Sequence, residues 1–370
     1  MFNARILPVS FTAYANSSFP WGYNDGAVWQ GRGLTAALSA GFAARLGPLS
    51  LVLNPVAFWA GNSSFELEPN GFTDSLRFAH GRFPTLIDAP QRFGDGPYGR
   101  VDPGQSTLAL VLPGVTAGVS TANHWWGPAS LQPIIFGNNA PGFRHLFLGT
   151  SEPLDLWVAK VHGRVVWGDL RQSGFTRNLP PADRRFLSGL AAVVEPRGLD
   201  GLEVGAGRIF HDPWPEEGLS LALFAKPFGD PLKSQRPSLD TLNPGDDPQD
   251  NGLGSLWMRW VFPEDGLEFY AEYGKEDYNW DLRDFIGEPE NSGGYLVGLR
   301  KLWRAGESGF YGIEVEHLDL RVSQYVLGRG GTRFLSAREP APRSHPTGPD
   351  FGFRVRARGV GHQRGAGSVS

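Results

Sequence analysis

Two adjacent tryptophans in a loop bounded by glycine and proline are the residues of this sequence best suited to ligand chemistry. They lie in the run NHWWGP at 123–128, which is followed by FGNNAPGF at 136–143. Indole rings offer flat apolar faces to sugar rings, and amides and an imidazole offer donors and acceptors to hydroxyl groups. An arginine nearby would clamp the carboxylate of an acidic polymer. The pattern predicts a glycan-binding surface made of His124, Trp125, Trp126, Asn138, Asn139 and Arg144.

The same residues also fit a purely structural role. In this alternative, one tryptophan points into the wall of the fold, the other caps the loop, and the asparagines make turns. The sequence leaves both interpretations open.

A second candidate group lies between Lys275 and Phe285, where acids, aromatic residues and an arginine follow an apolar alternation. Its glycan-binding candidates are Tyr278, Trp280 and Arg283. An ordinary solvated loop is the alternative.

Paired carboxylates, which glycosidases require, are the main argument for an enzyme. Glu268 and Glu272 lie about 13 Å apart on a strand, too far for either mechanism, whereas Glu314 and Glu316 lie about 6.6 Å apart, which suits inversion. Alternating acids also simply line a polar barrel lumen. Because the sequence has no Ser-His-Asp pattern, HExxH motif or phosphate-binding glycine loop, we expect no enzyme, catalytic residue, metal site or cofactor.

Apolar residues with a period of two predict the strands that carry these groups. The alternation over 33–46 predicts one strand. Gly47-Pro48 predicts a tight turn that joins it to a second strand over 49–53. A helix is the alternative for this alanine-rich stretch, although its glycines disfavour it. Further hairpins are predicted at 108–119, 190–206, 256–273 and 295–315. Six or so hairpins correspond to roughly twelve to fourteen strands.

The connections differ sharply in length. Turns within hairpins span about two to seven residues, whereas the links at 59–105, 123–153, 211–253, 275–292 and 319–350 are long. Short turns at one end and long loops at the other are typical of outer-membrane barrels. A soluble β-sandwich or propeller is the alternative, although its connections would differ less in length. We predict an all-β fold, an antiparallel outer-membrane-type β-barrel, as a single domain over 1–370 with clear hairpins from 33 to 320 and a poorly defined tail at 321–370.

One parity of each strand is apolar and should face lipid, while Arg, Glu and Ser occupy the other. The residues expected on the lipid face are Leu34, Leu38, Phe42, Leu256, Met258, Trp260, Leu267, Phe269, Tyr295, Val297 and Ile313.

Composition excludes several classes of protein. The formal net charge of −4 gives no basic footprint for nucleic acid. The absence of cysteine excludes disulfides and thiolate metal sites. No apolar run reaches the length of a transmembrane helix, and the start of the sequence does not resemble a signal peptide.

The run NHWWGP followed by FGNNAPGF resembles the Wzi capsule-assembly family of outer-membrane proteins. The stretch GLEVGAGR at 201–208 and the block 251–299, which contains GLEFYAEYGKEDYNWDLRDF, are also similar to that family. The resemblance spans about 100–320 and extends to Gly361-His362.

This resemblance implies a barrel of 18 strands that binds capsular polysaccharide and holds it at the cell surface as a lectin. Our strand count is lower. The family also has a signal peptide, a periplasmic helical part and aromatic-ended C-terminal strands. This sequence instead opens with a strand-like pattern and ends in a basic, glycine-rich stretch at 354–370. We therefore expect the chain to be a fragment or a truncated reading frame, incomplete at both ends.

These observations together predict a monomeric outer-membrane lectin whose partners are capsular polysaccharide and outer-membrane lipid. The alternatives are a general porin, whose polar lumen conducts solutes, and a glycan-active enzyme.

Overall fold

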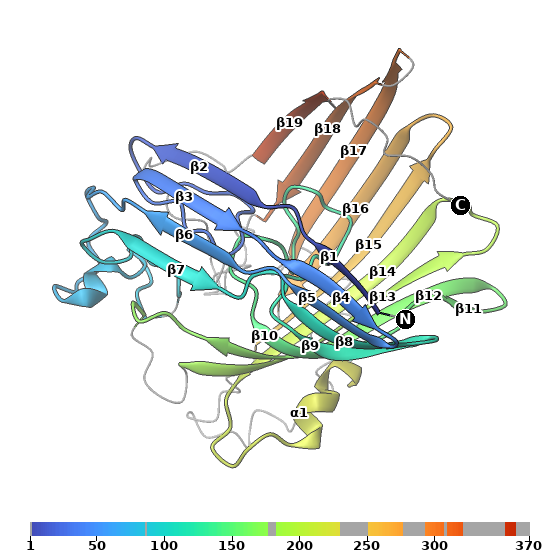
Figure 1. The fold of residues 1–370 in the computed structure, drawn as a ribbon, viewed down its shortest axis with the longest axis horizontal. Helices are drawn as coiled ribbons and strands as arrows, with labels where there is room; N and C mark the ends of the chain where they lie inside the picture. Colours follow the sequence, from blue (N-terminus) through green and yellow to red (C-terminus); the bar gives the residue numbers. More distant parts are fainter. Residues whose placement is uncertain are drawn as a thin grey trace.

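The computed structural model describes residues 2–85, 87–176, 183–229, 251–276, 293–306, 309–320 and 352–359. They form two antiparallel sheets, one of 15 strands and one of 4 (Figure 1). The strands of the larger sheet are β1 (Phe2–Ile6), β4 (Phe42–Leu46), β5 (Leu49–Leu53), β8 (Thr107–Leu112), β9 (Val115–Ser120), β10 (Arg144–Gly149), β11 (Leu154–Asp155), β12 (Ala159–Arg171), β13 (Arg184–Pro196), β14 (Leu202–Pro213), β15 (Asn251–Phe262), β16 (Leu267–Glu276), β17 (Gly293–Ala305), β18 (Gly309–Asp319) and β19 (Gly352–Gly359). Those of the smaller sheet are β2 (Ser10–Asn16), β3 (Gly33–Ser39), β6 (Val56–Ala60) and β7 (Tyr98–Asp102).

The larger sheet is a curved wall whose strands follow one another almost in chain order. The order is β1-β4-β5-β8-β9-β10-β12-β13-β14-β15-β16-β17-β18-β19, with β11 paired to β12. Within the described residues, β1 and β19 are its two edges, and the wall curves between them as an unclosed barrel (Figure 1). The predicted all-β, antiparallel barrel architecture is confirmed.

Helical structure in the described residues is short. It consists of η1 (Ser75–Phe78), α1 (Leu221–Ala225) and η2 (Lys226–Phe228). None of these helices is long and apolar enough to cross a bilayer.

The hairpins confirm the predicted contrast between short turns and long links. β4 and β5 are joined at Gly47-Pro48, β8 and β9 at Pro113-Gly114, and β15 and β16 at 263–266. The links 121–143 and 214–250 connect strands at the opposite end of the wall. We call these two ends the short-turn end and the long-loop end.

The predicted strand 33–46 is wrong in one respect, because it breaks at Ala40-Gly41 into β3 and β4. The neighbouring strands break at the same level, since β1, β4, β5 and β8 continue into β2, β3, β6 and β7 in the same order. A Cβ at position 41 would overlap the carbonyl oxygen of Leu53, so only glycine fits this crossing. The smaller sheet is therefore a bent continuation of four wall strands.

Some strands lie where loops or a tail were expected. β10 occupies part of the link predicted at 123–153, and β7 part of the link predicted at 59–105. β19 lies in the segment 321–370 that we expected to be poorly defined.

Side-chain parity confirms the predicted two faces of the wall. The residues expected on the lipid face are all exposed, except Trp260 and Leu267, which are half-exposed. Their neighbours of opposite parity, including Ser255, Glu268 and Glu272, are buried inside. The outward face is therefore apolar and the inward face polar, as a membrane barrel requires.

Met258 tests the outward face, because it lies on β15 between Val204 and Ala271 of the adjacent strands. Met258→Arg should lower the free energy of unfolding by about 2–4 kcal/mol near the middle of a bilayer, since lipid offers a guanidinium no partner. Urea unfolding of the barrel refolded into vesicles measures this change.

Met258→Leu is the matched control and should leave the unfolding midpoint unchanged. The adjacent Arg259 shows that the wall accepts arginine on its inner face, where it contacts Glu203 and Glu268. Equal midpoints for Met258→Arg and the wild type would show that this face does not contact lipid.

Candidate functional site

The link between β9 and β10, residues 121–143, lies inside the curved wall (Figure 1). We call it the interior loop. Its buried apolar residues and the inward residues of the wall form one hydrophobic core, which includes Trp126, Ala129, Ile134, Ile135 and Phe136 from the loop and Phe147, Val166, Leu187, Ile209, Tyr270 and Leu296 from the wall. Because these partners run from β10 to β17, the loop fills the inside of the barrel at this level.

Trp126 fixes the interior loop to the wall. Its side chain is 7% exposed and meets the ring of Phe136 edge to face, with centroids 4.9 Å apart. It packs over Gly189 of β13 and Gly207 of β14, where a Cβ would lie 3.1 and 3.2 Å from the indole. Two inward glycines thus make the space for this ring.

Trp125 has a different environment from its neighbour. Its side chain remains 39% exposed, and its indole Nε1–H donates to the carbonyl oxygen of Ala129 over 2.6 Å. The hydrogen bond fixes the ring orientation while leaving part of its surface accessible. Trp125 therefore presents a partly accessible ring, whereas Trp126 anchors the loop to the wall.

Gly127 makes the sharp turn that separates the tryptophan pair from Pro128. Its φ of +93° lies in the region that favours glycine. A Cβ there would also overlap the carboxylate of Glu272, which is buried on β16. Backbone conformation and close approach to the wall both explain the glycine of the NHWWGP run.

His124 forms a buried pair with His145 of β10, with the two Nε2 atoms 3.0 Å apart. His145 Nδ1 lies 2.8 Å from the carbonyl oxygen of Phe143, which requires a proton on Nδ1. The neutral His145 then accepts at Nε2, so His124 donates. Burial, together with His145 and Arg164 nearby, lowers the pKa of His124 to about 3, so the His124 imidazole stays neutral at physiological pH.

Asn123 holds the two ends of the interior loop together. Its Nδ2 donates to the carbonyl oxygens of Gly137 and Ala140 over 3.2 and 2.8 Å. These two residues flank Asn138 and Asn139. The clamp therefore sets the amide pair beside the start of the tryptophan run.

The segment between β2 and β3 braces the same end of the interior loop. The Gly26 N–H donates to the Asn138 carbonyl oxygen over 2.7 Å, and the Asn24 N–H donates to Asn139 Oδ1 over 3.0 Å. Asn24 Nδ2 donates to the Leu131 carbonyl oxygen over 2.8 Å. Asn139 nevertheless remains exposed and Asn138 half-exposed.

Glu316 of β18 anchors the interior loop on the far side of the barrel. Its carboxylate, 2% exposed as a residue, accepts from the backbone N–H groups of Ser130, Leu131 and Gln132 over 3.0, 3.3 and 2.6 Å. The Tyr270 hydroxyl donates to it over 2.9 Å. A buried carboxylate needs such donors, so this contact fixes the loop backbone.

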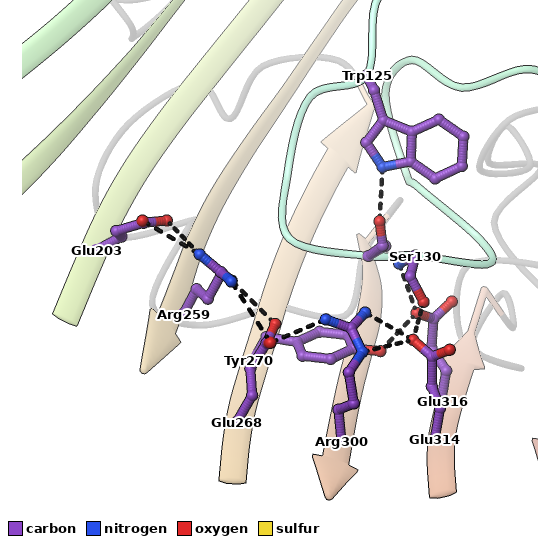
Figure 2. A network of polar contacts seen from close by, with 10 residues as sticks. Trp125, Ser130, Glu203, Arg259, Glu268, Tyr270, Arg300, Glu314 and Glu316 are labelled. Carbon is purple, nitrogen blue, oxygen red and sulfur yellow. Dashed lines mark hydrogen bonds and ion pairs between the residues drawn. The ribbon is translucent and has the colours of Figure 1, made fainter. Parts of the chain in front are cut away.

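A row of alternating charges extends from this anchor across five strands (Figure 2). Arg259 reaches Glu203 and Glu268 over 3.2 and 2.9 Å. Arg300 reaches Glu268 and Glu314 over 2.8 and 2.7 Å. Each acid lies beside a base on the neighbouring strand, so the row is a connected network.

Glu314 ends this row and also accepts from the Ser130 hydroxyl. The pair Glu314 and Glu316, whose spacing suited an inverting glycosidase, is thus engaged by the interior loop. Sequence reasoning missed Ser130 and Tyr270 as partners of these acids. Alternating Arg and Glu on the inward parity was the available signal, but it does not reveal which loop residues the acids bind.

The structure brings most of the first candidate group together and separates one member. His124, Trp125, Trp126, Asn138 and Asn139 belong to the interior loop. Arg144 begins β10 with the parity of the exposed Leu146 and Leu148, so it lies on the outward face of the wall. The second group, Tyr278, Trp280 and Arg283, lies outside the described residues.

No family model matches this sequence, and no curated protein matches it. Solved structures do match by fold. One is titled Wzi, an outer membrane protein involved in group 1 capsule assembly in Escherichia coli and a carbohydrate-binding β-barrel. It has a TM-score of 0.55 and 13% identity, and the match covers 90% of this chain and 59% of that protein. The chain thus spans about three-fifths of the protein it matches.

Other outer-membrane barrels match with lower scores. The channel DcaP of Acinetobacter baumannii has a TM-score of 0.32 and 10% identity, over 86% of this chain and 91% of that one. OprB of Pseudomonas putida has a TM-score of 0.39 and 12% identity, over 86% and 75%. The match with a TM-score of 0.55 and the antiparallel wall show the fold of an outer-membrane β-barrel. The apolar outward face of the wall fits a place in that membrane.

Replacing Glu316 tests what holds the interior loop in place. Glu316→Ala removes the acceptor of three backbone N–H groups, so we expect the loop to detach and the barrel to conduct ions more readily than the wild type in planar-bilayer recordings. Glu203→Ala, at the other end of the charge row, is the control and should not change conductance. Equal conductance of Glu316→Ala and the wild type would show that the loop stays in place without this anchor.

Proposed function

We propose that the protein is an outer-membrane lectin that binds capsular or extracellular polysaccharide and helps to assemble or attach it at the cell surface. The observation that carries the proposal is Trp125, a partly exposed indole held by a hydrogen bond on a loop that fills the barrel. A fixed aromatic face suits the apolar side of a sugar ring.

Asn138 and Asn139 are the polar partners that we assign to this surface. Both retain exposure, and the Asn123 clamp places their backbone beside the start of the tryptophan run. Their amides supply donors and acceptors for hydroxyl groups. We assign His124 and Trp126, which are buried, to positioning the loop rather than to contacting the glycan.

The second candidate group remains a proposal for additional contacts. In the sequence, Tyr278, Trp280 and Arg283 follow the last residue of β16, Glu276. That strand ends at the long-loop end, which faces outward from the cell in outer-membrane barrels. An aromatic contact contributes on the order of 1 kcal/mol beyond area burial. Several weak contacts along one polymer would therefore have to act together.

The filled interior supports a lectin over a general porin. A porin needs a water-filled lumen, whereas here a hydrophobic core joins the interior loop to strands from β10 to β17. The row of charged residues from Glu203 to Glu314 is the observation that favours the porin, because such residues also line conducting barrels. A large steady conductance of the wild type would favour this second candidate.

The resemblance of the NHWWGP and FGNNAPGF runs to the Wzi family also supports glycan binding. The structure titled as a carbohydrate-binding β-barrel has a similar fold. We propose binding without cleavage, because Glu314 and Glu316 both bond to the interior loop. We also propose that the barrel acts as a monomer.

Trp125→Ala tests the proposed surface. The variant should fold and insert like the wild type, because the ring is partly exposed, and it should bind purified capsular polysaccharide about five- to tenfold more weakly, since it lacks one aromatic contact. Surface plasmon resonance with immobilised polysaccharide measures the affinity. In cells, capsule should be released into the medium.

Two other tryptophans provide controls. Trp157, exposed near the short-turn end, should be replaceable by alanine without effect on binding. Trp126→Ala should instead lower the free energy of unfolding by about 3–5 kcal/mol, because it empties a packed site. If Trp125→Ala binds polysaccharide as tightly as Trp157→Ala, the assignment of Trp125 is wrong.

A further inference from the structure

The outward face of the wall carries a cluster of arginines at the long-loop end. Arg144 of β10 lies opposite Asp169 of β12 in the strand register, and Arg171 lies opposite Arg184 of β13. All four residues share the outward parity. We call them the rim patch.

One carboxylate is the centre of the rim patch. Arg184 donates to both Asp169 oxygens, from Nε over 2.8 Å and from Nη2 over 3.1 Å, and Arg171 Nε donates over 3.2 Å. Arg144 makes no hydrogen bond or ion pair within the described part of the chain, and it is exposed. Two guanidinium groups therefore pair with one carboxylate, and the third, that of Arg144, lies opposite it in the strand register. The four residues of the patch together carry a net charge of +2.

The segment 214–229 lies beside the rim patch on the outside of the wall, where Figure 1 shows α1. We call it the outer segment. Arg184 stacks over the ring of Trp214 at 3.4 Å, and Trp167 Nε1–H donates to the Phe224 carbonyl oxygen over 3.0 Å. Lys226 pairs with Asp212 of β14 over 2.5 Å. The segment is thus fixed to β12, β13 and β14.

The outer segment also exposes apolar side chains next to these charges. Leu221 is 88% exposed and Phe228 60% exposed. On β10, the exposed Leu146 and Leu148 follow Arg144 on the same face. Basic residues at the rim, with apolar residues beside and below them, match the boundary between the headgroups and the acyl chains of a membrane.

We infer that the rim patch and the outer segment bind a phosphorylated glycolipid of the outer leaflet. The guanidinium groups of Arg144 and Arg171 would contact the phosphate, since arginine binds phosphate with paired, charge-assisted hydrogen bonds. Leu221 and Phe228 would contact the acyl chains. This inference requires a barrel in the outer membrane but does not depend on lectin activity, because the rim patch lies on the opposite face of the wall from the interior loop.

The test measures binding of lipid A that carries both phosphates to the purified chain in detergent, by native mass spectrometry. The wild type should retain this lipid and release dephosphorylated lipid A. The double variant Arg144→Ala/Arg171→Ala should bind the phosphorylated lipid at least about tenfold more weakly. Leu221→Ser should weaken binding of the same lipid by a smaller factor.

Arg197→Ala is the matched control, because Arg197 is an exposed arginine paired with an aspartate, Asp155, near the short-turn end. It should bind lipid A like the wild type. Arg144→Glu is a second variant, because the Arg144 side chain has no partner in the described part of the chain and its replacement should not disturb the fold. Heat-modifiable gel mobility confirms that each variant is folded.

Three results would overturn the inference. They are equal retention of phosphorylated and dephosphorylated lipid A, unchanged binding by folded Arg144→Glu and the double variant, and binding of inorganic phosphate as tight as that of the lipid. The last result would indicate a site for free phosphate rather than for a glycolipid. Polysaccharide binding by Leu221→Ser, which lies outside every predicted glycan contact, should match the wild type, which separates this inference from the proposed lectin.

Discussion

Glu316 is a carboxylate removed from solvent, and the position of the interior loop depends on how that charge is satisfied. Its oxygens accept from three consecutive backbone N–H groups at 130–132 and from the Tyr270 hydroxyl. Removing a carboxylate from water without donors costs several kcal/mol. Consecutive N–H groups that point to one acceptor restrict the loop to few conformations, so an electrostatic requirement of β18 determines the shape of a segment that leaves from β9.

The opposite side of the interior loop is fixed by packing rather than by charge. Trp126 occupies space left by Gly189 and Gly207, and His124 joins His145 in a neutral, hydrogen-bonded pair. Neither contact introduces a net charge into the apolar part of the core. The loop thus makes two kinds of contact with the inner wall, packing over the glycines of β13 and β14 and hydrogen bonds to the acids of β18. Because the loop makes both kinds of contact at once, its 23 residues are held inside the barrel without regular secondary structure.

Much of the wall could be predicted from the sequence, because parity and turn residues are local signals. The period of two predicted the faces of β15 and β16. The turn residues predicted the hairpin at Gly47-Pro48, and the spacing of the hairpins predicted the contrast in connection lengths. The break at Ala40-Gly41 could not be predicted from local signals, because it depends on the close approach of the Leu53 carbonyl oxygen from another strand. The sequence predicted the candidate surface only as a set of residue types. Its division into an exposed Trp125, a buried Trp126 and an outward Arg144 required the register of β10 and the glycines of β13 and β14, which are non-local.

A rigid loop matters for a ligand that offers only weak contacts. Each stacking interaction between an indole and a sugar is small, and ordering a mobile loop on binding would cost a comparable amount for every side chain that is immobilised. Here the Glu316 anchor, the Asn123 clamp and the core around Trp126 order the loop through contacts within the chain. Trp125 is oriented by its own hydrogen bond to Ala129. The folding of the barrel therefore orders the loop in advance, which supports the proposed role of Trp125 as a contact for polysaccharide.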